Sequence, residues 1–86
     1  MIDIKEVDTM TKTVLFSHKK FIKEMKASNL SQEQLAEHLG ISDRHIRNLK
    51  RKDIPISAPL LYRISQEFGQ SMEYFLTSGE EGDDIL

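Results

Sequence analysis

The 86-residue sequence contains no cysteine and has only four glycines, two prolines and six aromatic residues. Without cysteine the chain has no disulfides, thiolate zinc sites or thiol nucleophiles, and a cytoplasmic protein is expected. No apolar run approaches the roughly 18 residues that a membrane span requires, so no membrane partner is expected. Residues 1–10 lack a basic segment followed by an apolar one, which argues against a secretion signal.

Glycine and proline lie near the ends of helical patterns or in loops, and extended alternating segments are scarce. The sequence therefore predicts a compact all-α domain of five helices, with one candidate strand at residues 2–7. The predicted helices cover residues 16–28 (with a start as early as Thr11), 32–39, 42–51, 58–68 and 72–76. We expect an N-terminal extension (1–10), a helical domain (11–77) and an acidic, mobile tail (78–86).

The formal net charge of −2 conceals two oppositely charged parts of the chain. Residues 12–52 carry ten basic and four acidic residues, whereas residues 53–86 carry one basic and seven acidic residues. A basic working half followed by an acidic one indicates a polyanionic partner for the first half.

Two short helices in the basic half have well-marked ends. Ser31 and Gln34 fit the capping box, in which each side chain bonds the other residue's backbone N–H. Gly40 is a natural helix stop, and Ser42 is placed to cap the next helix. Because only residues 40–42 separate the two helices, they must cross steeply, as in a helix-turn-helix.

The second of these helices is amphipathic in a specific way. At about 100° per residue, Ile46 and Leu49 share the inner face. Arginine offers a fork that matches guanine, and asparagine matches adenine, so the outer face could read bases. A charged outer face is also commonly just solvated, and the charge pattern alone leaves both readings open. The outer face carries Arg44, Arg47, Asn48 and Arg51, with Asp43 at its border.

Residues 17–77 resemble the Cro/CI-type (XRE-like) helix-turn-helix family. The family pattern is met by Leu30-Ser31-Gln32, Leu35-Ala36, Leu39-Gly40-Ile41-Ser42 and Ile46, with the helix-turn-helix at residues 31–52. The resemblance implies a lambda-repressor-like fold and a regulator, expected to be a repressor, that binds double-stranded DNA as a homodimer. No cofactor is implied.

The resemblance also implies roles for individual residues. The implied base-reading residues are Asp43, Arg44, Arg47 and Asn48. The implied phosphate contacts are Gln32, Ser42, Arg51 and Lys52, with Lys19 or Lys20 added from the first helix, and Gln32 would also brace the recognition helix. Lys50 is a further candidate phosphate contact because of its charge.

The chain departs from the family pattern at two places. Many relatives pair an arginine with a glutamate at the positions of Met25 and Lys50, so an apolar contact is expected here and Lys50 is free to add positive potential. Asp43 is an acid at a base-reading position, where it could accept from cytosine or act as a first-turn dipole partner.

Other readings remain open from the sequence. The chain could be an antitoxin whose acidic C-terminal part binds a protein partner, or a protein-interaction module that binds no DNA. The acidic tail could also compete with DNA for the basic face. No enzyme activity is expected, and the three histidines lack metal-ligand spacing. A candidate dimer patch contains Tyr62, Tyr74, Phe75 and Leu76, although packing in the core is the simpler explanation for these residues.

Overall fold

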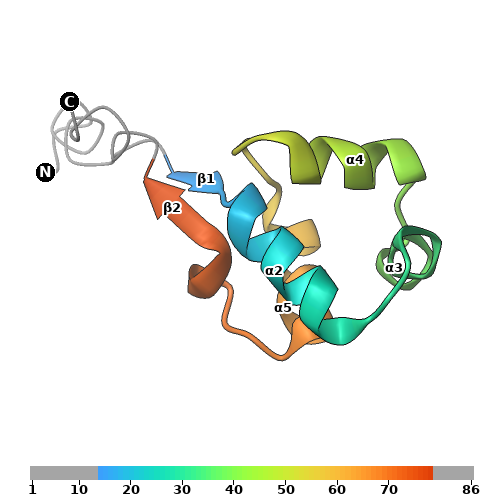
Figure 1. Ribbon diagram of the computed structural model, residues 1–86. Helices are drawn as coiled ribbons and strands as arrows, with labels where there is room; N and C mark the ends of the chain where they lie inside the picture. The colour runs from blue at the N-terminus through green and yellow to red at the C-terminus, as the bar shows by residue number, and fades with distance from the viewer. Residues whose placement is uncertain (1–13, 79–86) are drawn as a thin grey trace, which may run out of the picture.

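The computed structural model describes residues 14–78 as four α-helices, a 3-10 helix and a two-stranded sheet. The elements are β1 (Val14–Phe16), α2 (His18–Ser28), α3 (Gln32–Leu39), α4 (Asp43–Arg51), α5 (Ala58–Phe68), η1 (Glu73–Phe75) and β2 (Leu76–Ser78). In Figure 1, α4 lies along the top, α3 closes the right-hand end, and the sheet lies at the opposite end. None of the helices in this part of the chain is both long and apolar enough to cross a membrane.

Serine side chains define where the four α-helices begin. In each helix a serine Oγ accepts a hydrogen bond from the backbone N–H three residues further on, which satisfies one of the unpaired donors of the first turn. The capping serines are Ser17, Ser31, Ser42 and Ser57. The caps at Ser31 and Ser42 and the capping box with Gln34 confirm the predictions.

The predicted start of the first helix, at Phe16 or earlier, is wrong within the described residues. Val14–Phe16 form β1, which runs antiparallel to β2 with Phe16 opposite Leu76. On its other side Phe16 exchanges two backbone hydrogen bonds with Ile54, at 2.7 and 3.4 Å. These long-range partners hold Phe16 extended, and α2 begins only after the Ser17 cap. The candidate strand at residues 2–7 and the possible start at Thr11 lie outside the described residues.

The predicted fifth helix is also different in the structure. Ser71 Oγ accepts from the Tyr74 N–H at 3.1 Å as a cap would, but the helix is the single 3-10 turn Glu73–Phe75. Leu76 then has extended backbone angles and begins β2. An all-α, five-helix domain is therefore corrected to a mostly helical one with four α-helices and a small sheet in residues 14–78.

The core joins the sheet to the helices through aromatic rings. Phe16, Phe21 and Phe75 are fully buried, and the Phe16 ring centroid lies 5.3 Å from that of Phe21 and 5.7 Å from that of Phe75. At the other end of the domain the core is aliphatic. Its fully or almost fully buried members from α3 and α4 are Leu35, Leu39, Ile46 and Leu49.

Candidate nucleic-acid interface

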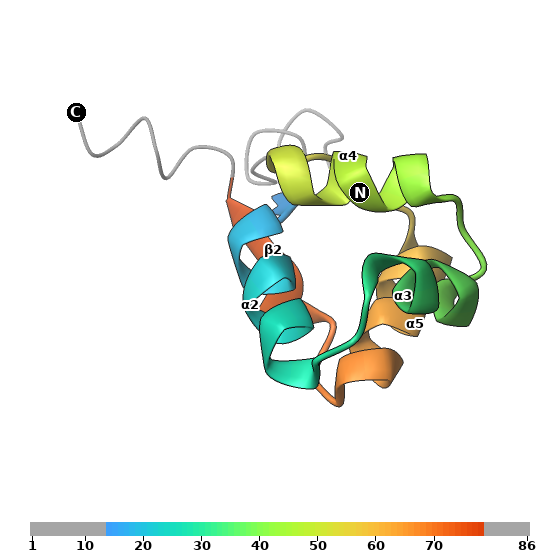
Figure 2. The same cartoon turned by 45° about the vertical axis from the view of Figure 1, so that its right-hand side comes forward.

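The turn between α3 and α4 is short and tightly hydrogen-bonded. Gly40 has φ 71°, a left-handed conformation that favours glycine, and its N–H bonds back to carbonyls of α3. The Ile41 N–H also returns to α3, donating to the Ala36 carbonyl at 3.0 Å. Ser42 Oγ then accepts from the His45 N–H at 3.1 Å and starts α4. Figure 2 shows the result, with α4 lying across the domain and α3 beneath its N-terminal end.

The inner face of α4 is anchored in the core. Ile46 and Leu49 are both 0% exposed, which fixes the rotation of the helix about its own axis. Arg44 and Arg47 are exposed, and Asn48 is half-buried. None of these three side chains makes a hydrogen bond or ion pair with any of residues 14–78, so their donors and the asparagine oxygen have no partner in the described part of the chain. This arrangement has the groups needed to recognise base edges.

The N-terminal turn of α4 carries the acidic residue of the predicted site. Asp43 is exposed and lies in the first helical turn, where a carboxylate interacts favourably with the helix dipole. Ser42 precedes it and is exposed as well. Because the Ser42 oxygen accepts the capping hydrogen bond, its hydroxyl proton is what it can still offer to an anion.

The basic C-terminal end of α4 divides into free and engaged side chains. Arg51 and Lys52 are exposed. Lys50 is half-buried, and its Nζ donates to Oε1 of Gln32, the first residue of α3, at 3.2 Å. The predicted phosphate contacts Gln32 and Lys50 are therefore brought together, but the Lys50 ammonium is bound to protein rather than free.

Asp53, directly after the basic end of α4, ties this end of the helix to α2. Its Oδ1 accepts from the His18 backbone N–H at 3.0 Å and lies 2.6 Å from His18 Nδ1. Partial burial by itself raises the pKa of Asp53, but the two hydrogen bonds from His18 and the nearby charges of His18 and Lys19 outweigh it. The pKa of Asp53 consequently lies below its ordinary value of 3.8. The link holds the exit of α4 against the first turn of α2.

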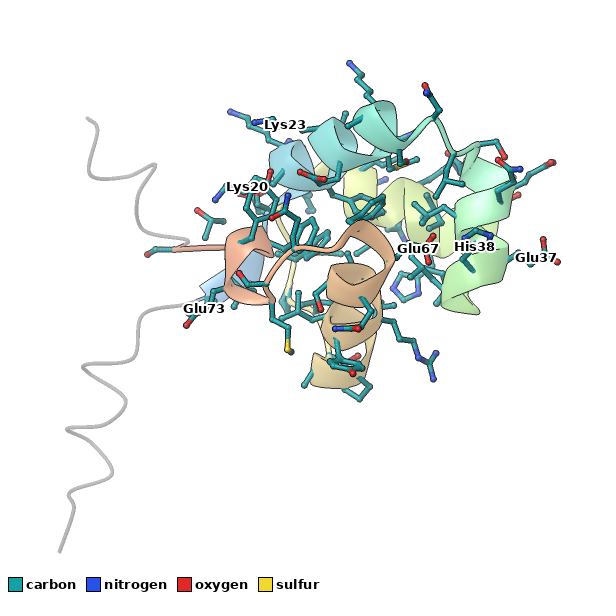
Figure 3. The ribbon with its side chains drawn as sticks, turned by 90° about the horizontal axis from the view of Figure 1, so that it is seen from below. Lys20, Lys23, Glu37, His38, Glu67 and Glu73 are labelled. Atoms are coloured by element: carbon teal, nitrogen blue, oxygen red, sulfur yellow. The ribbon has the colours of Figure 1, made fainter. Side chains whose placement is uncertain are left out.

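A second histidine pair joins α3 to α5. His38 Nδ1 lies 2.6 Å from Glu67 Oε2, and the two labelled side chains meet between these helices in Figure 3. Within residues 14–78 no group of three or more histidine, cysteine or carboxylate side chains is arranged to hold a metal ion. His18 and His38 thus serve as links between elements.

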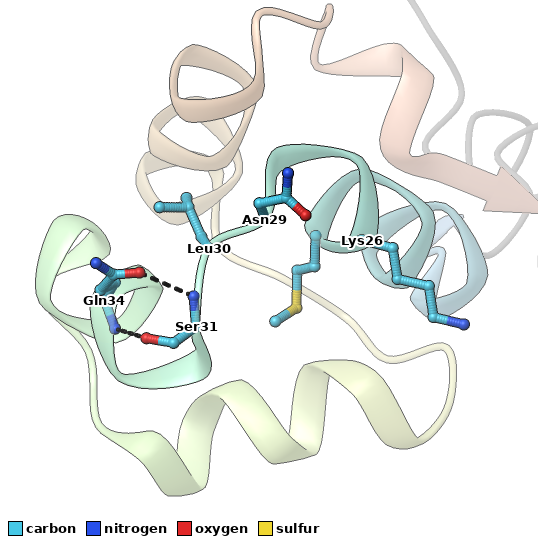
Figure 4. Close-up of a pocket in the computed structure, with 6 residues that line it drawn as sticks. Lys26, Asn29, Leu30, Ser31 and Gln34 are labelled. Atoms are coloured by element: carbon cyan, nitrogen blue, oxygen red, sulfur yellow. Dashed lines mark hydrogen bonds between the residues drawn. The ribbon is translucent and has the colours of Figure 1, made fainter.

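A shallow hollow of about 470 Å³ opens between the end of α2 and the start of α3 (Figure 4). Lys26 lines it together with the Ser31–Gln34 capping box. Lys20, by contrast, has its Nζ 5.1 Å from the centroid of the Tyr74 ring, on the side of α2 that faces η1. Lys26 therefore lies beside the hollow and Lys20 does not, although Lys26 was not among the predicted phosphate contacts. No local signal distinguishes Lys26 from Lys19 and Lys23, which lie on the same stripe of α2.

A helix-turn-helix family model, that of the Cro/CI-type XRE regulators, matches residues 22–75, more than half of the chain. The chain belongs to this family. No curated protein and no solved structure is similar enough to match. The family consists of DNA-binding regulators, so the chain is a DNA-binding helix-turn-helix regulator.

The first departure from the XRE family pattern, at the paired positions Met25 and Lys50, can now be compared with the structure. Met25 is 9% exposed and belongs to the hydrophobic core, so an apolar side chain occupies the position where relatives carry an arginine. Lys50 bonds to Gln32 instead of adding a free positive charge. A link between α3 and α4 is thus present in this XRE protein where the pattern expects one between α2 and α4.

Proposed function

We propose that this protein is a sequence-specific transcriptional repressor that inserts α4 into the major groove of double-stranded DNA. One observation carries the proposal. Two fully buried residues, Ile46 and Leu49, turn the unpaired side chains of Arg44, Arg47 and Asn48 outward in a member of a DNA-binding family. A major groove is about 12 Å wide and admits an α-helix presented in this way.

The proposed contacts fall into two classes. Arg44, Arg47 and Asn48 would bond base edges, with Asp43 accepting from a cytosine at the border of the arc. Contacts to the phosphate backbone set the position on the duplex and carry no sequence information. The proposed phosphate contacts are Gln32, Ser42, Arg51 and Lys52, to which the hollow beside α3 adds Lys26.

The length of α4 supports a dimer. Nine residues rise about 13.5 Å, which spans only about four base pairs at 3.4 Å each. A homodimer with half-sites about one helical turn apart would read a longer operator. Of the predicted dimer patch, Tyr62 is 54% exposed and available, whereas Phe75 is fully buried and is not part of that surface. A genomic operator agrees with the expected cytoplasmic location.

Selection of bound duplexes from a random library tests the proposal directly. We expect an enriched palindrome whose half-sites lie about one turn apart, and binding that weakens steeply with added salt. Failure to enrich any sequence, together with no salt-dependent binding to mixed genomic DNA, would contradict the proposal and favour a protein-interaction module.

A further inference from the structure

The hydrogen bond between Lys50 and Gln32 joins the last turn of α4 to the first residue of α3. A lysine ammonium has three donors and no acceptor, whereas a glutamine amide has an oxygen that accepts and an NH₂ group that donates. The ammonium can therefore pair only with Oε1, at 3.2 Å. Which end of the Gln32 amide faces α4 follows from this chemistry.

The other end of the amide is left for a ligand. With Oε1 held by Lys50, the Nε2 group of Gln32 is the free end, and this residue is half-buried beside the start of α3. A phosphate has only acceptor oxygens, so it can bond the NH₂ group and is repelled by the carbonyl oxygen. The ammonium also polarises the amide and strengthens its N–H donors.

We propose that Lys50 is a positioning residue for DNA binding, which holds the Gln32 amide with its NH₂ group toward a phosphate. This inference rests on the proposed DNA-binding function and refines it. Lys50 acts through Gln32 and does not itself touch the backbone. The Lys50 ammonium thus acts at the junction of α3 and α4, where it fixes the orientation of the Gln32 amide.

Substitutions at residue 50 can reverse, abolish or keep the orientation of the Gln32 amide. In Lys50→Glu the carboxylate accepts from Nε2 and turns the amide, so that Oε1 faces the phosphate. In Lys50→Met neither orientation is held. In Lys50→Arg the guanidinium has donors only and keeps Oε1 inward. These three variants therefore separate orientation from the presence of a side chain.

The test is a double-mutant cycle on DNA affinity, using the full chain and its selected duplex at several salt concentrations. Each residue 50 variant is made with Gln32 and with Gln32→Ala, because the alanine background retains the charge effect of residue 50 and lacks the amide. We expect Lys50→Glu to weaken binding about tenfold more in the Gln32 background than in the Gln32→Ala background. Lys50→Met should give a smaller excess, and Lys50→Arg none.

A direct contact between Lys50 and a phosphate would give a different result. If each residue 50 variant has the same effect in both backgrounds, and Lys50→Met lowers the salt slope by about 0.9, then Lys50 contacts a phosphate directly and the inference is wrong. Thermal unfolding of all variants measures any change in stability. If Lys50 had only a structural role, its substitution would lower the unfolding temperature. Among variants of equal stability, the effect of residue 50 on DNA affinity would then be the same with Gln32 and with Gln32→Ala.

The proposed function can fail separately. If the wild-type chain shows no salt-dependent DNA binding at all, the proposed function is wrong and this inference falls with it. If the wild-type chain binds DNA and the two backgrounds respond alike, the positioning role alone is overturned. Nuclear magnetic resonance of the Gln32 side-chain NH₂ in the complex provides a second readout. Lys50→Arg should preserve its phosphate-bonded shift, and Lys50→Glu should remove it.

Discussion

The helix-turn-helix at residues 31–52 and the sheet of β1 and β2 depend on contacts of very different sequence separation. Both ends of α3 and the start of α4 are set by residues within about four positions along the chain, such as the Ser31–Gln34 box, Gly40 and Ser42. β1 and β2 instead depend on each other and on Ile54, far along the sequence. The comparison teaches that the recognition unit is locally encoded, whereas its support is assembled by long-range contacts.

The largest expected effect is at Phe16, the residue on which the long-range contacts converge. Phe16→Ala removes a fully buried ring that packs on Phe21 and Phe75, and it should lower the free energy of unfolding by about 3–5 kcal/mol. Urea denaturation measures the loss. Val14→Ala, at a neighbouring position that is 50% exposed, is the control and should cost no more than about 0.5 kcal/mol. Similar small losses at both positions would break the comparison.

The outer face of α4 should respond in DNA binding and not in stability. Arg44→Ala is expected to lose about 1–3 kcal/mol of discrimination at one base pair, because a bidentate base contact is removed. Lys52→Ala should weaken all sequences alike and reduce the salt slope by about one. Binding to a library of operator variants measures both effects. Uniform loss from both Arg44→Ala and Lys52→Ala would contradict the assigned roles.

A local cap should have a moderate effect. Ser31→Ala removes the side-chain acceptor for the Gln34 N–H, and we expect a loss of about 1 kcal/mol in stability. Ser31→Gly should cost only a few tenths of a kcal/mol. Thermal unfolding measures the difference, and Gln66→Ala at an exposed position of α5 is the control. A loss at Ser31 much larger than this would mean that the cap also supports distant contacts.

The Asp53 link should make stability depend on pH. Because the pKa of Asp53 is lowered in the folded protein, its contribution is present above its ordinary value of 3.8 and is lost as pH falls through the folded pKa. We expect wild type to be more stable than Asp53→Asn at pH 7, with the difference shrinking in that acidic window. His18→Ala should keep part of the dependence, since the backbone bond remains. A constant difference between pH 7 and pH 2 would contradict the link.

The smallest expected effect concerns the acidic C-terminal residues. Ser78 pairs with Val14 in β2, so the truncation that tests the tail should begin at Gly79. Removing residues 79–86 deletes four acidic residues and should raise nonspecific DNA affinity by a few fold through reduced repulsion. Binding to mixed genomic DNA at low salt measures this. Unchanged affinity would mean that the tail does not compete for the basic face.

Much of the recognition unit was predictable because its signals are local. The capping box at Ser31, the stop at Gly40 and the inward positions of Ile46 and Leu49 each follow from neighbouring residues. The outward positions of Arg44 and Arg47 follow from helical periodicity once two anchors are known. Their roles at bases remain predictions.

The remaining features could not be found from one stretch of sequence. In the sequence Asp53 is an ordinary loop residue, and only the fold places His18 of α2 beside it. Lys26 likewise looks like the other lysines of α2, and only the fold places it at the hollow beside α3. Lys50 was expected to carry a free charge, because no residue near it in the sequence indicates its hydrogen bond with Gln32.

The sequence by itself determined the helices of the recognition unit and which side of α4 turns outward, because caps and periodicity act over one or two turns. Only the tertiary structure decided that Phe16 and Leu76 are extended, and that Lys50 donates a hydrogen bond to Gln32. Strand pairing and side-chain partners depend on which distant residues the packed core brings together. Local propensity carries no information about that choice.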